Sequence, residues 1–237
     1  MENKRLMPII SIITVSFNAE KTIRKTIESV INQTYKNIEY IIIDGESKDN
    51  TVNIIKEFNK SINYWCSEKD YGIYDAMNKG LKIANGDFVI FLGADDIFFS
   101  DTTLEDIIEK LDDKYVCYGD SYITQIRKIY WGKFNKYKIS IGNICHQAIF
   151  YPKKIYKNKE YQLKYKIYAD YVYNIEIFNK IQFKYLDETI SVFNYNGISN
   201  THSDKNFNND KARLIIKNIG ILPFIISWLY KQLRKII

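Results

Sequence analysis

Apolar runs alternate with helically spaced segments between residues 8 and 118, and this alternation restricts the possible folds more than any other feature of the chain. The runs Pro8–Val15, Tyr40–Ile43 and Phe88–Leu92 are nearly continuous, as in strands buried on both faces. The segments between them carry apolar residues on one helix face, for example Ile23, Ile27, Val30 and Ile31. A short strand near residues 63–66 and a helix over residues 71–84 continue the order. This order predicts right-handed βαβ units, and therefore an α/β fold whose mostly parallel sheet is flanked by helices.

The alternation stops after about residue 118. Residues 119–145 are rich in Tyr, Lys and Ile with period-two stretches, which predicts hairpin-like strands. A helix is expected over residues 167–180 and a strand over residues 183–195. No linker rich in Pro, Gly or Ser divides the chain. We therefore expect one domain over residues 1–205, followed by a C-terminal helical extension over residues 206–237.

Polar residues follow three of the predicted strands where each strand ends, as Ser16-Phe17-Asn18, Asp44-Gly45 and Asp95-Asp96. Ligands of open α/β sheets bind at the carboxyl ends of the strands, so these residues are expected to meet in one crevice. Adjacent carboxylates repel each other, and Mg²⁺ or Mn²⁺ held by Asp95 and Asp96 would remove that repulsion. Such a cation completes its shell with water and substrate phosphates, which favours a nucleoside diphosphate as ligand. Asp and Gly are also common in ordinary turns, but their recurrence at successive strand ends favours a site.

The charge balance alone identifies no partner. The chain has 34 basic and 28 acidic residues, a formal net charge of +6, which would suit a nucleic acid, an anionic membrane or a phosphorylated substrate. Because the basic residues are scattered while the acids are organised, we predict no nucleic-acid partner. The three cysteines are widely spaced, which favours thiols in a reducing compartment over a zinc site or a disulfide framework. With no signal peptide recognised after the N-terminus, a cytoplasmic location is expected.

Several nucleotide-binding and hydrolytic motifs are missing from the sequence. It has no GxGxxG after the first strand, no GxxxxGK[ST] and no GxSxG. A metal-dependent sugar-nucleotidyltransferase remains an alternative because it also uses paired acids at the end of a parallel sheet, although its usual Gly-rich basic loop is absent here. A non-catalytic module that binds a membrane surface is the second alternative.

Three segments resemble the family 2 glycosyltransferases of the GT-A fold: "SIITVSFNAEKTIRKTIESVINQTYKNIEYIIIDGESKDNT", "YGIYDAMNKGLKIANGDFVIFLGADD" and "IYADYVYNIEIF". The resemblance covers residues 8 to about 195. It implies an inverting transfer of a sugar from a nucleotide-sugar donor, a UDP-sugar first of all, usually with Mn²⁺ or Mg²⁺. It also implies that Asp95 and Asp96 bind the metal and that Asp170 is the general base. The implied donor-binding residues are Thr14, Ser16, Phe17, Asn18, Asp44, Asp75, Asp95, His146 and His202.

Some of these residues also have purely structural interpretations. Asp170 lies early in a predicted helix, where an acid interacts favourably with the helix dipole. Asp75 fits a helix surface, His146 fits a packed core, and His202 lies in a polar segment that fits a loop.

The sequence departs from the family pattern at three places. The family often has an acid two positions before the central Asp, where this chain has Gly93. The usual "DDGS" is "DGES" here, with one Asp fewer. The QxxRW sequence of processive synthases is absent. We therefore expect one or a few sugar additions to a saccharide or lipid-linked acceptor rather than a long polymer.

The C-terminal segment combines an apolar run with cations. Residues 219–230 are apolar or small, and Lys231, Arg234 and Lys235 follow them. The run is too short to span a bilayer, which takes roughly 20 residues. It predicts a basic amphipathic helix at the inner face of the plasma membrane, with Trp228 and Tyr230 at the headgroup level. The alternatives are a helix packed on the domain or a homo-oligomer formed through the C-terminal helices.

Overall fold

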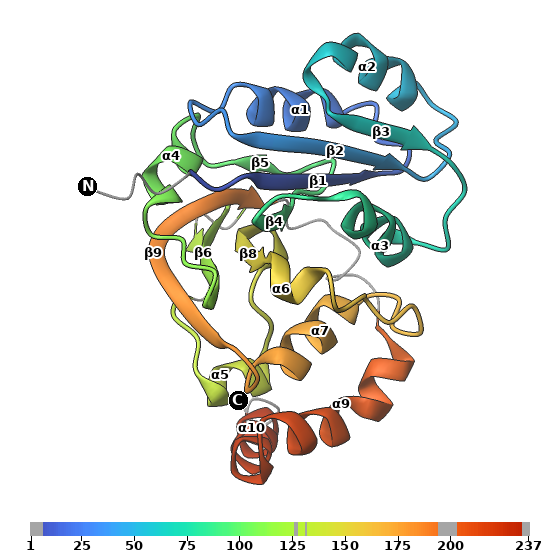
Figure 1. Cartoon of the computed structure of the whole chain (residues 1–237). Coiled ribbons are helices and arrows are strands. Elements are labelled where there is room, and N and C mark those ends of the chain that lie inside the picture. The colour runs from blue at the N-terminus through green and yellow to red at the C-terminus, as the bar shows by residue number, and fades with distance from the viewer. Residues whose placement is uncertain (1–6, 126–127, 131, 194–202, 234–237) are drawn as a thin grey trace, which may run out of the picture.

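One twisted sheet runs through the molecule. The computed structural model describes residues 7–125, 128–130, 132–193 and 203–233 (Figure 1). The first four strands are parallel and lie in the order β3-β2-β1-β4. Their bounds are β1 (Ile10–Ser16), β2 (Ile38–Asp44), β3 (Tyr64–Ser67) and β4 (Phe88–Phe91). The predicted α/β fold with a parallel sheet is confirmed in this half of the chain.

The second half of the sheet mixes directions. β8 is antiparallel to β4, β6 is antiparallel to β8, β9 is parallel to β6, and β5 is antiparallel to β9. A short β7 pairs with β6 as a hairpin, which the period-two pattern predicts. The same prediction is wrong for the later part of residues 119–145, because Lys136–Ile141 form a helix. The bounds are β5 (Ile97–Phe98), β6 (Tyr115–Ile123), β7 (Lys128–Ile129), β8 (Ile149–Pro152) and β9 (Gln182–Phe193).

Helices cover both faces of the sheet (Figure 1). One face packs against α1 (Ile23–Ile31), α2 (Thr51–Glu57) and α4 (Thr103–Ile108). The other packs against α3 (Ile73–Ile83), α7 (Ala169–Ile177) and α9 (Lys205–Asn218). The other helices in the described residues are α5 (Lys136–Ile141), α6 (Lys153–Tyr156) and α10 (Ile221–Leu233), with 3₁₀ turns η1 (Asn59–Ser61) and η2 (His146–Ala148).

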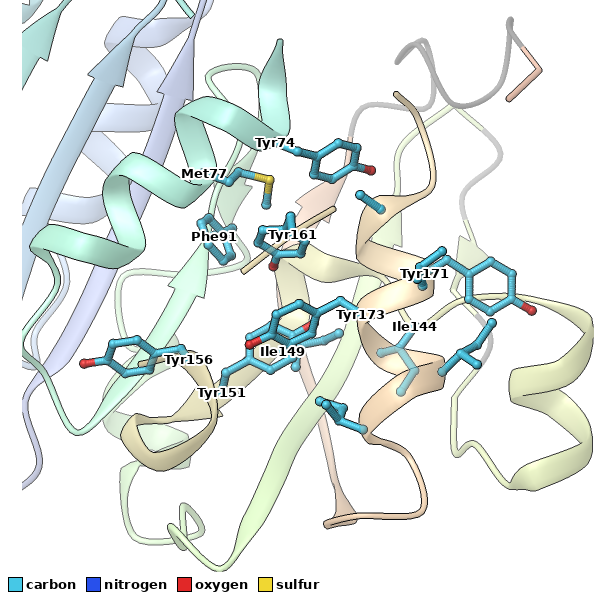
Figure 2. Packing of buried hydrophobic residues seen from close by; sticks show 14 of the residues in the cluster. Tyr74, Met77, Phe91, Ile144, Ile149, Tyr151, Tyr156, Tyr161, Tyr171 and Tyr173 are labelled. Carbon is cyan, nitrogen blue, oxygen red and sulfur yellow. The ribbon is translucent and has the colours of Figure 1, made fainter. Parts of the chain in front are cut away.

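The alternation of side chains along the central strands explains why two cores form. Ile12 and Ile42 belong to the core beneath α1 and α2, whereas Ile13, Ile41 and Ile43 belong to the core beneath α3 and α7. In the second core, Tyr74 of α3 and Phe91 pack against Tyr161, which packs in turn against Tyr173, as Figure 2 shows. The strands are therefore buried on both faces, as their continuous apolar runs predict.

Two helices, α9 and α10, form the chain from Lys205 to Leu233. Asp204 begins α9 by accepting a hydrogen bond from the Phe207 backbone N–H at 3.0 Å. Phe207, Leu214 and Ile215 of α9 are buried in the core that α3 and α7 cover. Gly220, with φ of 124°, ends α9 and separates it from α10. In the part of the chain that the structure describes, no helix is long and apolar enough to cross a membrane.

Candidate functional site

A cavity of about 950 Å³ opens where β1 and β4 end and where α7 and α9 begin. Several segments of the chain contribute to its wall. They include residues 17–22 after β1, 93–96 after β4, 141–147 before β8, 166–168 and 170–171 at the start of α7, and Phe207, Asn208 and Lys211 on α9, together with Ile73 and Tyr74 at the start of α3. The ends of β1 and β4 therefore share one crevice, whereas Asp44 and Gly45 at the end of β2, which were expected there, do not line it.

Asp95 and Asp96 both line the cavity but differ in exposure. Asp95 is exposed, whereas Asp96 is only 2% exposed. Two donors fix the Asp96 carboxylate, because its Oδ2 accepts from Gln147 Nε2 at 2.8 Å and from the Gly93 backbone N–H at 3.2 Å. Thr26 Oγ1 donates to the Asp96 backbone carbonyl at 2.8 Å and fixes the turn itself. The pair is therefore held in a defined orientation at the carboxyl end of β4.

Gly93 has a structural role in this turn. A Cβ added at residue 93 would lie 2.7 Å from Asp96 Oδ2. The space that a side chain would fill is therefore taken by the Asp96 carboxylate, whose oxygen the Gly93 N–H contacts. This close approach accounts for the glycine at a position where the family often carries an acid.

Asp170 lies in the first turn of α7 and lines the same cavity as the β4 turn. Its Oδ1 lies 2.8 Å from Tyr74 Oη of α3, whose single proton is shared with the backbone carbonyl of Ile167 at 2.5 Å. Its Oδ2 accepts from Asn143 Nδ2 at 2.7 Å. Its side chain is 11% exposed. The carboxylate is thus oriented by two donors while it still faces the cavity.

His146 stands in the electrostatic field of all three acids. Its Nδ1 lies 3.6 Å from Asp170 Oδ2, and its side chain is 24% exposed in the cavity wall. Burial lowers the pKa of His146, but the contact with Asp170 and the charges of Asp96 and Asp95 raise it, and the net shift is upward from 6.5. The neighbouring carboxylates therefore stabilise the charged form of His146 more than burial opposes it.

Asp44 lies behind the cavity wall and organises the loops at the ends of β1 and β2. It is fully buried, and it accepts hydrogen bonds from the hydroxyls of Ser16, Ser47 and Ser67 at 2.9, 2.5 and 2.6 Å. Ser47 Oγ in turn accepts from the Asn18 backbone N–H at 2.8 Å. Asp44 therefore fixes the position of the loop that carries Phe17 and Asn18.

The structure gathers some of the predicted donor-binding residues in the cavity wall and places others outside it. Phe17, Asn18, Asp95 and His146 line the cavity, and Phe17 is 65% exposed there. Thr14, Ser16, Asp44 and Asp75 do not belong to the lining residues: Thr14 is buried beside Tyr40, and Asp75 accepts from the Tyr71 backbone N–H at the start of α3. His202 lies outside the described residues.

The sequence profile described as "Glycosyl transferase family 2" matches residues 11–182, which is most of the chain. The chain belongs to glycosyl transferase family 2. A "PGL/p-HBAD biosynthesis glycosyltransferase" of Mycobacterium bovis is 31% identical over 211 residues, covering 84% of this chain and 82% of that protein. Membership of the family that the sequence resembles is therefore confirmed.

Solved structures share the fold of this family 2 glycosyltransferase. S. aureus TarS (residues 1–349) in complex with UDP-GlcNAc has a TM-score of 0.72 at 20% identity, covering 89% of this chain and 66% of that one. A mannosyltransferase from Pyrobaculum calidifontis in complex with GDP-Man and Mn²⁺ has a TM-score of 0.64 at 14% identity, covering 80% and 57%. This chain covers 39% of a longer TarS chain. The likeness confirms the GT-A fold.

The acids of the β4 turn fit a cation that is shared with a phosphate group. Among the described residues, no three His, Cys, Asp or Glu side chains gather into a metal site. Mg²⁺ and Mn²⁺ need only one or two protein carboxylates when water and substrate phosphates supply the other ligands. Asp95 and Asp96 provide such a donor set at the edge of the cavity.

Sequence reasoning did not identify several residues that contact the predicted acids or line the cavity. Asn143 and Gln147 donate to Asp170 and Asp96, and Tyr74 donates to Asp170. Lys211 of α9 lines the cavity, although the family profile ends at residue 182. The apolar pattern of the sequence identifies none of these residues. Three polar residues, Asn143, His146 and Gln147, do stand close together just before the apolar run of β8, and such a polar cluster could have indicated a site.

Proposed function

We propose that this family 2 glycosyltransferase moves a sugar from a nucleoside-diphosphate sugar to a hydroxyl of a saccharide or lipid-linked acceptor, with inversion at the anomeric carbon. One observation carries the proposal: a single cavity is lined by the acids of the β4 turn and by Asp170, which two donors orient. A UDP-sugar is our first choice of donor. The UDP-GlcNAc bound by TarS, which has the same fold, supports that choice.

The donor would lie along the ends of β1 and β4. Phe17 offers an exposed aromatic face for the base, and Asn18 lies beside it. Ser16 and Asp44 hold the loop from behind, and Thr14 is buried in β1 beside Tyr40. The diphosphate would lie at the β4 turn, where Asp95 and Asp96 would hold Mn²⁺ or Mg²⁺. When bound, that cation offsets charge on the departing diphosphate. The Mn²⁺ in the mannosyltransferase of the same fold supports this assignment.

Asp170 would be the general base. Its carboxylate removes the proton from the acceptor hydroxyl while the hydroxyl oxygen forms a bond to the anomeric carbon. The bond between that carbon and the diphosphate oxygen breaks, and the nucleoside diphosphate leaves with the bonding electrons. Attack from the face opposite the leaving group inverts the configuration. His146, beside Asp170, would contact the donor sugar or the acceptor.

We infer a role in the synthesis of surface glycans, on the basis of the relative named for PGL/p-HBAD biosynthesis. We place the enzyme in the cytoplasm at the inner face of the membrane, and α10 supports this location. Its outward residues include Leu222, Ile225, Trp228 and Leu229, each at least 43% exposed, whereas Pro223 turns inward and is buried. The cations that follow this surface in the sequence suit an anionic membrane. Pairing of α10 with a second copy is the alternative.

The decisive experiment measures nucleotide release from UDP-GlcNAc, other UDP-sugars and GDP-Man, with Mn²⁺ or with EDTA. We expect release of the nucleoside diphosphate from at least one donor in Mn²⁺ and its loss in EDTA. Release of pyrophosphate from a nucleoside triphosphate and a sugar 1-phosphate would instead identify a sugar-nucleotidyltransferase. Membrane binding without turnover of any donor would identify a binding module.

A further inference from the structure

Two amide side chains reach from one short segment to two different carboxylates of the cavity. The segment is Asn143–Gln147, between α5 and β8. Asn143 Nδ2 donates to Asp170 Oδ2 at 2.7 Å, and Gln147 Nε2 donates to Asp96 Oδ2 at 2.8 Å. We propose that Asn143 and Gln147 are positioning residues, Asn143 for the base Asp170 and Gln147 for the donor-side acid Asp96. The inference rests on the proposed function, because it takes the roles of the two acids from there.

A chain of hydrogen bonds fixes the orientation of the Asn143 amide. A carboxylate only accepts hydrogen bonds, so the Asn143 amide must present its NH₂ group to Asp170. Its Oδ1 is then the acceptor for Asn174 Nδ2 at 2.9 Å, and Asn174 Oδ1 accepts from Tyr151 Oη at 2.7 Å. Asn174 and Tyr151 are both buried, and Asn174 lies one helical turn after Asp170 on α7. Because the Asp170 carboxylate can only accept, the donor and the acceptor of each other hydrogen bond in this series are fixed as well.

Gln147 is oriented in the same way by a second, shorter chain. Cys145 Sγ donates to Gln147 Oε1 at 2.8 Å, which leaves the Gln147 NH₂ group facing Asp96. Burial raises the pKa of Cys145 to about 12, so the thiol keeps the proton that it donates. Gln147 and Asp96 are both buried. The bond between them is therefore shielded from water, whereas the bond of the Gly93 N–H to the same oxygen is only partly buried.

One segment therefore sets the positions of two carboxylates, one of which would act on the donor and the other on the acceptor. Asp96 would face the departing diphosphate, and Asp170 would face the incoming hydroxyl. Reacting groups lose rate when they move by a fraction of an ångström, so a fixed spacing between the two carboxylates is valuable. Because each amide contacts only one of the two acids, its loss should affect only the step that this acid serves.

The test compares Gln147→Leu and Asn143→Leu in the full chain. Binding of UDP in Mn²⁺ is measured by calorimetry, and kcat is measured for hydrolysis of the UDP-sugar that the wild-type chain turns over. A hydrogen bond to a charged group is lost in each variant, so effects of about tenfold are expected. Gln147→Leu should weaken Mn²⁺-dependent UDP binding about tenfold. Asn143→Leu should lower kcat about tenfold and leave UDP binding within about twofold.

Gln162→Leu is the matched control. It removes an amide-to-carboxylate bond of the same length, between Gln162 Nε2 and Glu176 Oε1 at 2.8 Å, away from the cavity wall. It should change neither UDP binding nor kcat. Where a leucine variant does not fold, Asn143→Ser and Gln147→Ser remove the same amides with less added apolar surface.

The proposal is overturned if either amide variant changes UDP binding and kcat together in proportion to its loss of thermal stability, because that is the behaviour of a purely structural residue. It is also overturned if neither variant differs from Gln162→Leu. Failure of the proposed function looks different: the wild-type chain would then bind no UDP in Mn²⁺, or Asp170→Asn would keep the wild-type kcat.

Discussion

Asp170 is the residue whose surroundings bear most directly on chemistry. Tyr74 and Asn143 hold its two oxygens, and the residue still faces the cavity. Asp170→Asn keeps the shape of the side chain but replaces the basic carboxylate with a neutral amide. We expect kcat to fall by about 10² or more while UDP binding in Mn²⁺ stays within about twofold. Steady-state kinetics and calorimetry measure the two quantities. An unchanged kcat with a raised KM would make Asp170 a binding residue.

His146 gives the folded protein a pH-dependent contribution to its stability. Burial opposes the charged form, but Asp170, Asp96 and Asp95 outweigh it and raise the pKa above 6.5. A raised pKa stabilises the folded state fully below the unfolded value, and this contribution disappears as the pH rises through the folded pKa. His146→Asn should therefore be destabilised most at about pH 6 and least at about pH 8.5.

Urea unfolding of wild type and His146→Asn at both pH values measures this difference in the free energy of unfolding. His146→Asn keeps a polar side chain that does not titrate, so the comparison isolates the charge. A difference of equal size at both pH values would show that the imidazolium does not contribute.

At the residue scale, the sequence predicts the acids better than their partners. Asp95, Asp96 and Asp170 are recognised because each stands at a strand end or a helix start within a motif. Asn143 and Gln147 could not be assigned to them, because those contacts depend on how an irregular segment crosses from α5 to β8. The burial of Asp44 behind three serine hydroxyls was equally hidden, since Ser16, Ser47 and Ser67 come from three different strand ends.

At the element scale, the first four strands and α1 to α3 follow the predicted order, because apolar period and burial agree along this part of the chain. The second half was harder. β9 is a twelve-residue strand that pairs in parallel with β6 across a long separation in sequence, and its register shifts near Asp120. Neither the partner nor the shift follows from local periodicity, because a strand pattern does not specify which neighbour it pairs with.

The apolar surface of α10 gives the element-scale prediction. Removal of residues 221–237 leaves buried Ile219 and the whole of α9 in place. We expect this truncation to abolish flotation with anionic liposomes at low salt and to leave hydrolysis of the donor intact. Each cation near an anionic surface contributes about 1 kcal/mol, and the exposed apolar side chains add transfer free energy. The attachment should therefore weaken as salt rises.

Two point substitutions refine the flotation experiment. Ile225→Glu changes a residue of α10 that is 43% exposed, and Ile216→Glu changes one of α9 that is 41% exposed. Only the first should reduce flotation. Equal flotation of the full-length and truncated chains would contradict membrane binding, and a smaller particle by light scattering after truncation would favour a homo-oligomer.

At the scale of the whole molecule, the cavity joins parts of the chain that are far apart in sequence. Its wall combines the ends of β1 and β4 with the starts of α7 and α9, and the sheet between the two cores connects these elements. A ligand that contacts both the strand ends and the helix starts should therefore stabilise the whole folded chain. That linkage permits a test that needs no knowledge of the acceptor.

UDP with Mn²⁺ should raise the thermal midpoint of the whole protein. A ligand at a hundred times its Kd adds about 2.7 kcal/mol to the free energy of unfolding. For a chain of this size each kcal/mol raises Tm by roughly 2–4 °C, so a rise of about 5–10 °C is expected. Scanning calorimetry measures it. EDTA should remove the rise, and Asp96→Asn should lose most of it while its Tm without ligand stays close to wild type. A larger rise with UTP than with UDP would favour a nucleotidyltransferase, because that enzyme binds a triphosphate, whereas a glycosyltransferase site is built around the diphosphate that it releases.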